Sequence, residues 1–425
     1  MTSAVALNSV QRAPCILTPL VTAYVALLPY QFEVGNGVNF APADCFLLLA
    51  LLLAPGQLHY RKAAWSVWHF GVLATFATGS FIAALRFGVI DRYELLNKDA
   101  GLLLSFLSYC AITSSIAAWE DLRRILRVFA LTVVFQNILS IAGFLSGYFF
   151  GVTNPFTRYG GLRLSGMLLD PNAYGGLLVA ALVICEGASL GPAPLFKGPK
   201  LWFFRATLAM GILFTFSRSA WIALAVALLL LCALHARVAL RVFVAAIIGV
   251  PCLLLLMGDR FLPVFEEMAS RPRQVQGRFD LIHDAFQAFT RHPFLGGGIG
   301  SFRLGEGEIA HNSAMWFLAD FGIVGLVVLL GFVGWFFVKG WFAWRRAPVR
   351  EQSLVLSVLV AHAAMFGLAM GIEAFYQRHW WLVMGLIASS YCLTISRVNY
   401  RYRSSGQSGR LEEAGDKIAC PLRPS

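Results

Sequence analysis

The stretch SAMWFLADFGIVGLVVLLGFVGWFFV, residues 313–338, decides the fold class, because it carries a single charged residue, Asp320. About 20 consecutive apolar residues are enough to cross the hydrocarbon core of a bilayer as an α-helix. The side chains do not alternate between polar and apolar, as those of a transmembrane β-strand would. This stretch therefore predicts a membrane-spanning helix.

The rest of the chain has the same character. Of its 425 residues, 58% are hydrophobic and 13% are charged, and the mean hydropathy is +0.69. Soluble domains carry about 25% charged residues, so the composition excludes a soluble globular domain and a disordered chain. The sequence predicts an all-α, polytopic membrane bundle of about twelve helices. The expected spans are residues 14–31, 41–56, 64–85, 100–119, 128–150, 171–190, 201–216, 219–235, 240–257, 313–338, 353–372 and 379–396.

The distribution of Lys and Arg predicts the orientation. With the N-terminus in the cytoplasm, the inner loops hold a clear excess of basic residues, as the positive-inside rule requires. We expect a retained first span rather than a signal peptide, because no convincing small-residue cleavage site is present. Both termini are then cytoplasmic, residues 1–396 form one transmembrane domain, and residues 397–425 form a polar cytoplasmic tail. The net charge of +12 follows this loop pattern, so we expect the phospholipid bilayer as a partner and no nucleic acid.

One loop, residues 258–312, is long and is predicted to lie outside. Within it, Phe279, Ile282, Phe286 and Phe289 recur at helical spacing over residues 278–291, which predicts an amphipathic helix on the outer membrane surface. Glycines at 296–298 and 300 then predict a flexible turn into the next span. Long ordered loops tend to be functional, so this one is where we expect chemistry.

Arginine residues collect at outer helix ends, although the positive-inside rule disfavours them there. A convergence of guanidinium groups suits a pyrophosphate or another polyanion, because each group makes bidentate, charge-assisted contacts. Arg218 interrupts two apolar runs, so it is either an anion ligand or a side chain that reaches the lipid headgroups. The outer arginines that suggest such a site are Arg158, Arg163, Arg218, Arg271, Arg273, Arg278, Arg303 and Arg378.

Other polar residues lie where helices are predicted to begin on the outer face of the membrane. Asp170 and Pro171 form a helix-start pattern, and Asn172 could then face the outer cavity. His311 is either an interfacial residue or a proton acceptor, and Asn312 or Ser313 is expected to cap the following helix. Asp320 lies within that span, either as the structural partner of an outer arginine or with a chemical role.

The sequence predicts neither a metal site nor a cofactor. Its eight Cys residues form no C-x-x-C pair and are expected to be small core residues. No H-E-x-x-H, P-loop, G-x-S-x-G or D-x-D motif stands out.

The order of several short motifs resembles the O-antigen ligase and polymerase superfamily of bacterial envelope glycosyltransferases. The resemblance covers about residues 160–335, and it is carried by RLSGMLLDPN (163–172), TFSRSA (215–220), GRFD (277–280), HPFLGGGIGSF (292–302), HN (311–312) and DFGIVG (320–325). Asp320 departs from the glutamate of many members.

This resemblance implies a GT-C-like helical fold in the bacterial inner membrane. It also implies that a glycan is transferred from undecaprenyl diphosphate to an acceptor on the periplasmic face, without metal or nucleotide. By matching motifs, Arg218 and Arg278 would hold the diphosphate, and His311 would act on the acceptor hydroxyl. Arg163, Asn172, Arg303, Asn312 and Arg378 are the expected substrate-binding residues around them.

Several functions stay open at this point. A ligase would move finished polymer onto lipid A-core in lipopolysaccharide synthesis. A polymerase would extend a lipid-linked O-antigen, capsule or exopolysaccharide chain, and we favour the ligase. A twelve-span transporter is the alternative of another class, but it would place polar residues near the membrane midplane, whereas these crowd one face. A structural scaffold would leave Arg218 without an explanation.

Overall fold

The computed structural model describes residues 16–34, 38–88, 94–159, 161–238, 240, 241, 247 and 272–396. Helices dominate these residues, as the composition predicts. They are α1 (Leu17–Leu27), α2 (Pro42–Leu53), α3 (Val67–Phe87), α4 (Ala100–Ser115), α5 (Trp119–Phe150), α6 (Pro171–Ala188), α7 (Gly198–Phe214), α8 (Arg218–Leu234), α10 (Pro272–Arg291), α11 (Ser301–Glu306), α12 (Ser313–Arg346) and α13 (Val349–Ala369). A last helix covers residues 378–396.

Strands are few and short. β1 (Phe32–Val34) pairs antiparallel with β2 (Val38–Phe40), and β3 (Thr157–Arg158) pairs antiparallel with β4 (Arg163–Leu164). Two 3₁₀ turns (Pro55–Gln57 and Lys62–Ala64) follow α2, and the π-helical turn η3 (Glu94–Asp99) leads into α4.

Six helical segments of the described residues are long and apolar enough to cross a membrane. They are Val67–Phe87, Glu94–Ser115, Trp119–Phe150, Pro171–Ala188, Ser313–Arg346 and Val349–Ala369, and α1, α2 and α8 are shorter apolar helices. The chain is therefore a helical, multi-pass membrane protein. The total of twelve spans stays a prediction, because most of the expected span 240–257, like the tail 397–425 and loop residues 258–271, lies outside the described residues.

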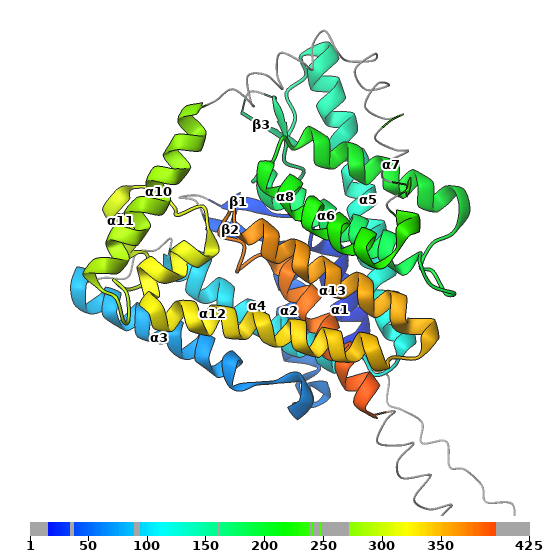
Figure 1. The fold of residues 1–425 in the computed structure, drawn as a ribbon, viewed down its shortest axis with the longest axis horizontal. Helices are drawn as coiled ribbons and strands as arrows, with labels where there is room; N and C mark the ends of the chain where they lie inside the picture. The colour runs from blue at the N-terminus through cyan, green and yellow to red at the C-terminus, as the bar shows by residue number, and fades with distance from the viewer. Residues whose placement is uncertain are drawn as a thin grey trace, which may run out of the picture.

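The central helix of the bundle is α13, which packs against α6, α8 and α12. Figure 1 shows α12 and α13 side by side, with α3 along α12 and with α10 and α11 at one end of it. Large apolar side chains on peripheral helices stay exposed, among them Leu52, Val67 and Leu85. In a membrane protein such side chains contact lipid tails rather than water.

A kink divides α12 at Gly322, whose φ of 68° and ψ of −163° are far from helical. This region of backbone space is nearly confined to glycine, and a Cβ here would lie 2.4 Å from the carbonyl oxygen of Phe294. The kink frees backbone groups on both of its sides, and each freed group must find a partner inside a membrane protein.

The glycine-rich turn supplies those partners. Gly297 and Gly298 donate to the carbonyls of Ala319 (3.1 Å) and Asp320 (3.0 Å), while Ile323 and Val324 donate to residues 293 and 294. Residues 296–300 are buried. The predicted flexible turn is therefore wrong: this segment is packed into the kink and hydrogen-bonded there.

The predicted amphipathic helix is confirmed as α10, which begins at Pro272 rather than near 278. It buries Ala285 in the core and exposes Phe279, Ile282 and Phe286. The helix packs on α12 and α11, and its exposed side carries both apolar residues and polar ones such as Asp280 and His283.

Candidate functional site

Three helices of the bundle, α6, α8 and α12, begin close together, and each is capped by a polar side chain. Asp170 accepts the backbone N–H of Asn172 at 2.9 Å at the start of α6. Ser217 accepts that of Ala220 at 3.2 Å at the start of α8, and Asn312 accepts that of Ala314 at 2.9 Å at the start of α12. The expected caps at Asp170 and Asn312 are confirmed. Helix N-termini carry partial positive charge and attract anions.

An unusual backbone conformation precedes each of these caps. Leu169, Phe216 and His311 all have positive φ angles, of 66°, 47° and 49°. Non-glycine residues rarely adopt such angles, and the strain persists only where surrounding contacts fix the backbone. Such positions cluster at functional sites, and here they mark the starts of the same three helices.

Arg163 connects two of the helix starts. From β4, its Nε donates to the carbonyl of Thr215 at 2.9 Å, and its Nη2 donates to Oδ1 of Asn172 at 3.0 Å. The same Asn172 oxygen accepts the hydroxyl of Ser217 at 2.9 Å. Asn172 therefore connects Arg163 to Ser217, the residue that directly precedes Arg218.

Arg163, Arg218 and Arg278, which come from β4, α8 and α10, form the arginine cluster. Burial lowers the pKa of Arg163, and the charges of Arg278 and Arg218 lower it further. Burial and the charge of Arg218 likewise lower the pKa of Arg278. The three guanidinium groups therefore lie in one electrostatic environment, although they are up to 115 residues apart in sequence.

Negative charge around the arginine cluster is scarce. Asp170 is the one carboxylate that raises the pKa of both Arg163 and Arg278. Among the described residues, no carboxylate forms an ion pair with any of the three guanidinium groups. Like charges held together without counter-ions are stabilised when an anion binds between them.

His311 lies next to this cluster. Burial lowers its pKa and the charge of Arg278 lowers it further, while the charges of Glu373, Asp170 and Glu308 oppose the shift. A lowered pKa leaves the imidazole neutral near pH 7, so that a ring nitrogen is free to accept a proton. His311 thus lies within electrostatic range of Arg278, which in turn interacts with Arg218 and Arg163.

Two other predicted site residues occupy different surroundings. Arg378 makes a two-point contact with Asp44 of α2, at 2.9 and 2.5 Å. Arg303 donates to Glu94 at 2.7 Å, and Glu94 is 1% exposed. Both arginines already have carboxylate partners, so the geometry assigns them to structural ion pairs and not to the arginine cluster.

The carboxylate of Asp320 is saturated by nearby donors. It accepts the backbone N–H groups of Gly300 (2.8 Å) and Phe302 (3.0 Å), the hydroxyl of Ser301 and the indole N–H of Trp316. The expected arginine partner is wrong. Asp320 instead caps α11 from the interior of α12, which is a structural role.

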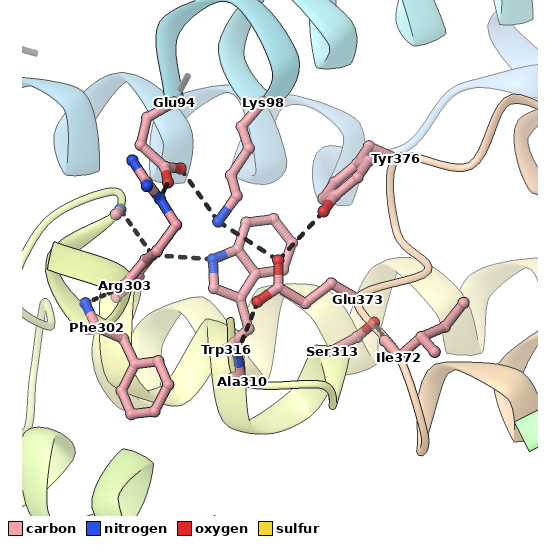
Figure 2. Close-up of polar contacts among 12 residues, drawn as sticks. Glu94, Lys98, Phe302, Arg303, Ala310, Ser313, Trp316, Ile372, Glu373 and Tyr376 are labelled. Carbon is pink, nitrogen blue, oxygen red and sulfur yellow. Dashed lines mark hydrogen bonds and ion pairs between the residues drawn. The ribbon is translucent and has the colours of Figure 1, made fainter. Parts of the chain in front are cut away.

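Sequence reasoning missed a buried ionic network at this end of the bundle. Lys98 lies 3.1 Å from Glu94 and 3.4 Å from Glu373, and all three side chains are at most 2% exposed. Figure 2 shows the network, which extends through Arg303 and Tyr376. Its one signal in the sequence is the charge of Glu94, Lys98 and Glu373 at predicted ends of apolar runs. Arg271 lies outside the described residues, and within them no three His, Cys, Asp or Glu side chains group as metal ligands would.

Comparison with known proteins bears on the part of the chain that contains the arginine cluster. Residues 203–330 match a family model described as O-antigen ligase. No curated protein matches the chain. The matched region contains Arg218, Arg278 and His311, whereas Arg163, Asn172 and Arg378 lie outside it. Over residues 203–330, the match confirms the resemblance to the O-antigen ligase and polymerase superfamily that the motifs predict.

Proposed function

We propose that the protein transfers a glycan from undecaprenyl diphosphate to a sugar hydroxyl at the periplasmic face of the bacterial inner membrane. The observation that carries this proposal is the arginine cluster, which lacks ion-pair partners among the described residues and lies beside a histidine whose pKa is lowered. A diphosphate suits three guanidinium groups that have no carboxylate partner, because each can make charge-assisted contacts with its oxygens. The match of residues 203–330 to the O-antigen ligase family model supports the same class of reaction.

In the proposed reaction the acceptor hydroxyl oxygen attacks the anomeric carbon of the donor glycan. The bond from that carbon to the diphosphate oxygen breaks, and its electron pair leaves with the diphosphate. Arg218 and Arg278 stabilise the charge that develops on this leaving group. His311 accepts the hydroxyl proton through a ring nitrogen, which its lowered pKa keeps available.

The remaining residues of the site position these groups. Arg163 adds a third positive charge, and Asn172 fixes both Arg163 and the start of α8. Asn312 caps α12 and thereby sets the direction of the chain just after His311. Arg303 and Arg378 support the fold through their carboxylate partners. No step of this scheme requires a metal or a nucleotide.

The decisive experiment is a deletion in the native host, complemented with the wild-type gene or with His311→Ala. Lipopolysaccharide is separated on a gel, and lipid-linked glycans are extracted and sized. Loss of long-chain glycan from lipid A-core, with full-length polymer accumulating on the lipid diphosphate, identifies ligase-type transfer. Single repeat units left on core or carrier identify a polymerase of O-antigen, and loss of secreted polysaccharide alone identifies an exopolysaccharide polymerase.

An unchanged set of glycans would contradict the proposal. So would full complementation by His311→Ala, because the proposed proton acceptor would then be dispensable. Immunoblots of the membrane fraction establish that both proteins insert to the same level.

A further inference from the structure

The backbone on both sides of His311 is held by one short segment, residues 370–374, which connects α13 to the last helix. Asn312 donates through Nδ2 to the carbonyl of Met370 at 3.1 Å. Ser313 donates to the carbonyl of Ile372 at 3.0 Å and accepts the N–H of Ala374 at 2.9 Å. These three bonds fix the chain after His311.

The contact before His311 comes from a side chain. Glu373 accepts the backbone N–H of Ala310 through Oε1 at 3.1 Å. Figure 2 shows this carboxylate between Ala310 and Tyr376, with Lys98 above it. His311 therefore lies between two anchored neighbours, and its strained φ of 49° is maintained by contacts from residues 370–374.

Segment 370–374 also reaches the arginine cluster. Gly371 accepts the hydroxyl of Ser219 at 3.1 Å, and Ser219 follows Arg218 directly in α8. A Cβ on Gly371 would come within 2.2 Å of that hydroxyl oxygen. One segment thus sets the position of the proposed proton acceptor relative to an arginine that binds the leaving group.

Glu373 is well suited to anchor a backbone amide. It is 4% exposed, and its second oxygen accepts the hydroxyl of Tyr376 at 3.2 Å and lies 3.4 Å from Lys98. Lys98 also pairs with Glu94, which pairs with Arg303. Glu373, Lys98 and Glu94 are therefore buried charges that have partners, and removing one partner of a buried pair is costly.

We propose that Glu373 is the positioning residue of His311, which it holds through the N–H of Ala310 in the strained conformation that faces the arginine cluster. This inference rests on the function proposed above. Glu373 touches neither donor nor acceptor in this scheme, and it acts through the backbone of residue 310.

The charge of Glu373 has a second effect on the same histidine. The charged groups that act on His311 are Arg278 from α10, Asp170 from the start of α6, Glu308 from the segment before it, and Glu373. The three carboxylates raise the pKa of His311, and Arg278 lowers it. Removing the charge of Glu373 therefore lowers the pKa of His311 further, so the neutral base persists to lower pH.

The test compares Glu373→Ala and Glu373→Gln with the wild type in bilayer nanodiscs. The donor is lipid-linked glycan extracted from the deletion strain, and the acceptor is lipopolysaccharide from the same strain. Glu373→Ala removes the acceptor for Ala310, and misplacement of a catalytic group by about 1 Å costs about 100-fold in rate. We expect a loss of that size in kcat, with the KM for the donor unchanged.

Glu373→Gln separates the bond from the charge, because its amide oxygen still accepts the N–H of Ala310. We expect a kcat at neutral and alkaline pH close to that of the wild type, with the acid limb of the pH profile moved to lower pH. This variant keeps the proposal testable if Glu373→Ala fails to fold.

Two control variants remove carboxylates that do not contact Ala310. Glu94→Gln neutralises an equally buried member of the same network, and we expect a lower thermal stability with kcat and pH profile retained. Glu308→Gln removes an exposed charge, and we expect a small shift of the acid limb to lower pH with no loss of kcat.

The positioning role is overturned if Glu373→Ala retains the wild-type kcat and pH profile while His311→Ala is inactive. It is overturned equally if Glu94→Gln reproduces the loss of kcat, because the effect would then be a general loss of stability. Activity in His311→Ala would instead remove the proposed function, and this inference with it.

Discussion

Asn172 and Arg163 share one hydrogen bond, 3.0 Å long, at the point where α6 begins. The bond places a neutral amide, and not a carboxylate, against the guanidinium group of Arg163. The guanidinium thus keeps its full positive charge for a ligand, while its orientation is fixed.

Asn172→Asp is expected to weaken donor binding. The new carboxylate would pair with Arg163 and repel a diphosphate at the same site, so the KM for the donor should rise about tenfold, the equivalent of 1.4 kcal/mol. Steady-state kinetics in nanodiscs measure the change. Asn172→Ala is the control, since it removes the hydrogen bonds without adding charge and should raise KM less. An Asp variant with wild-type KM would show that no anion binds near Arg163.

Arg218→Ala and Arg278→Ala are each expected to lower the transfer rate about 100- to 1000-fold, because each removes a donor from the developing charge of the leaving group. Gel analysis of lipopolysaccharide and in vitro kinetics both report the loss. Arg291→Ala is the matched control, because Arg291 is an exposed basic residue on the same helix as Arg278. Wild-type transfer in both cluster variants would refute the assignment of the leaving-group site.

The pH profile of transfer is expected to carry an acid limb below the ordinary range of histidine. Burial and Arg278 lower the pKa of His311, and a base is active only in its neutral form. In Arg278→Ala the acid limb of the residual activity should lie at higher pH. The reason is that the positive charge of Arg278 no longer repels the protonated imidazole of His311. Rates measured between about pH 4 and 9 test the direction. A shift to lower pH would exclude electrostatic coupling of the two residues.

Gly322→Ala is expected to destabilise the protein by about 3 kcal/mol, the upper range for a strained backbone position. Its φ of 68° disfavours any side chain, and the new Cβ would collide with the carbonyl of Phe294. Thermal unfolding in detergent measures the effect. Gly334→Ala is the control in the same helix, since nothing lies within 4 Å of its Cβ. Equal melting temperatures for the two variants would contradict the packed kink.

Arg378→Gln is expected to lower stability rather than substrate binding. It breaks an ion pair whose side chains are 16% and 10% exposed, and an unpaired buried charge costs on the order of 3 kcal/mol. The KM for the donor should stay unchanged. The double variant Asp44→Asn with Arg378→Gln is expected to recover much of the stability, because no charge is then left unpaired. A raised KM in Arg378→Gln would show instead that Arg378 takes part in substrate binding.

The helical membrane fold could be predicted because it depends on local rules, and the arginine cluster because its members share one predicted face. Apolar runs fix the helices, and Arg218, Arg278 and His311 stand where the chain enters or leaves the bundle on one predicted face. Asp170 and Asn312 follow capping rules that need only their own helix. The helices and their caps use residues close together in sequence, whereas the arginine cluster joins residues up to 115 positions apart.

The partners of Arg303 and Arg378 could not be predicted in this way. Their carboxylates, Glu94 and Asp44, lie 209 and 334 residues away, and only the packing of α2, η3 and the last helix brings them near. The glycine turn was misjudged for a related reason. Its composition indicates flexibility, but the kink at Gly322, which is distant in the sequence, supplies the hydrogen-bond partners that order it.

The kink in α12 also has an evolutionary consequence. Residues 293–298 and 319–324 satisfy each other's backbone groups, so neither segment can change its conformation alone. Selection must therefore treat them as one unit, and substitutions in the two segments are expected to covary among relatives. A relative that has lost the glycine turn should also have lost the break in this helix.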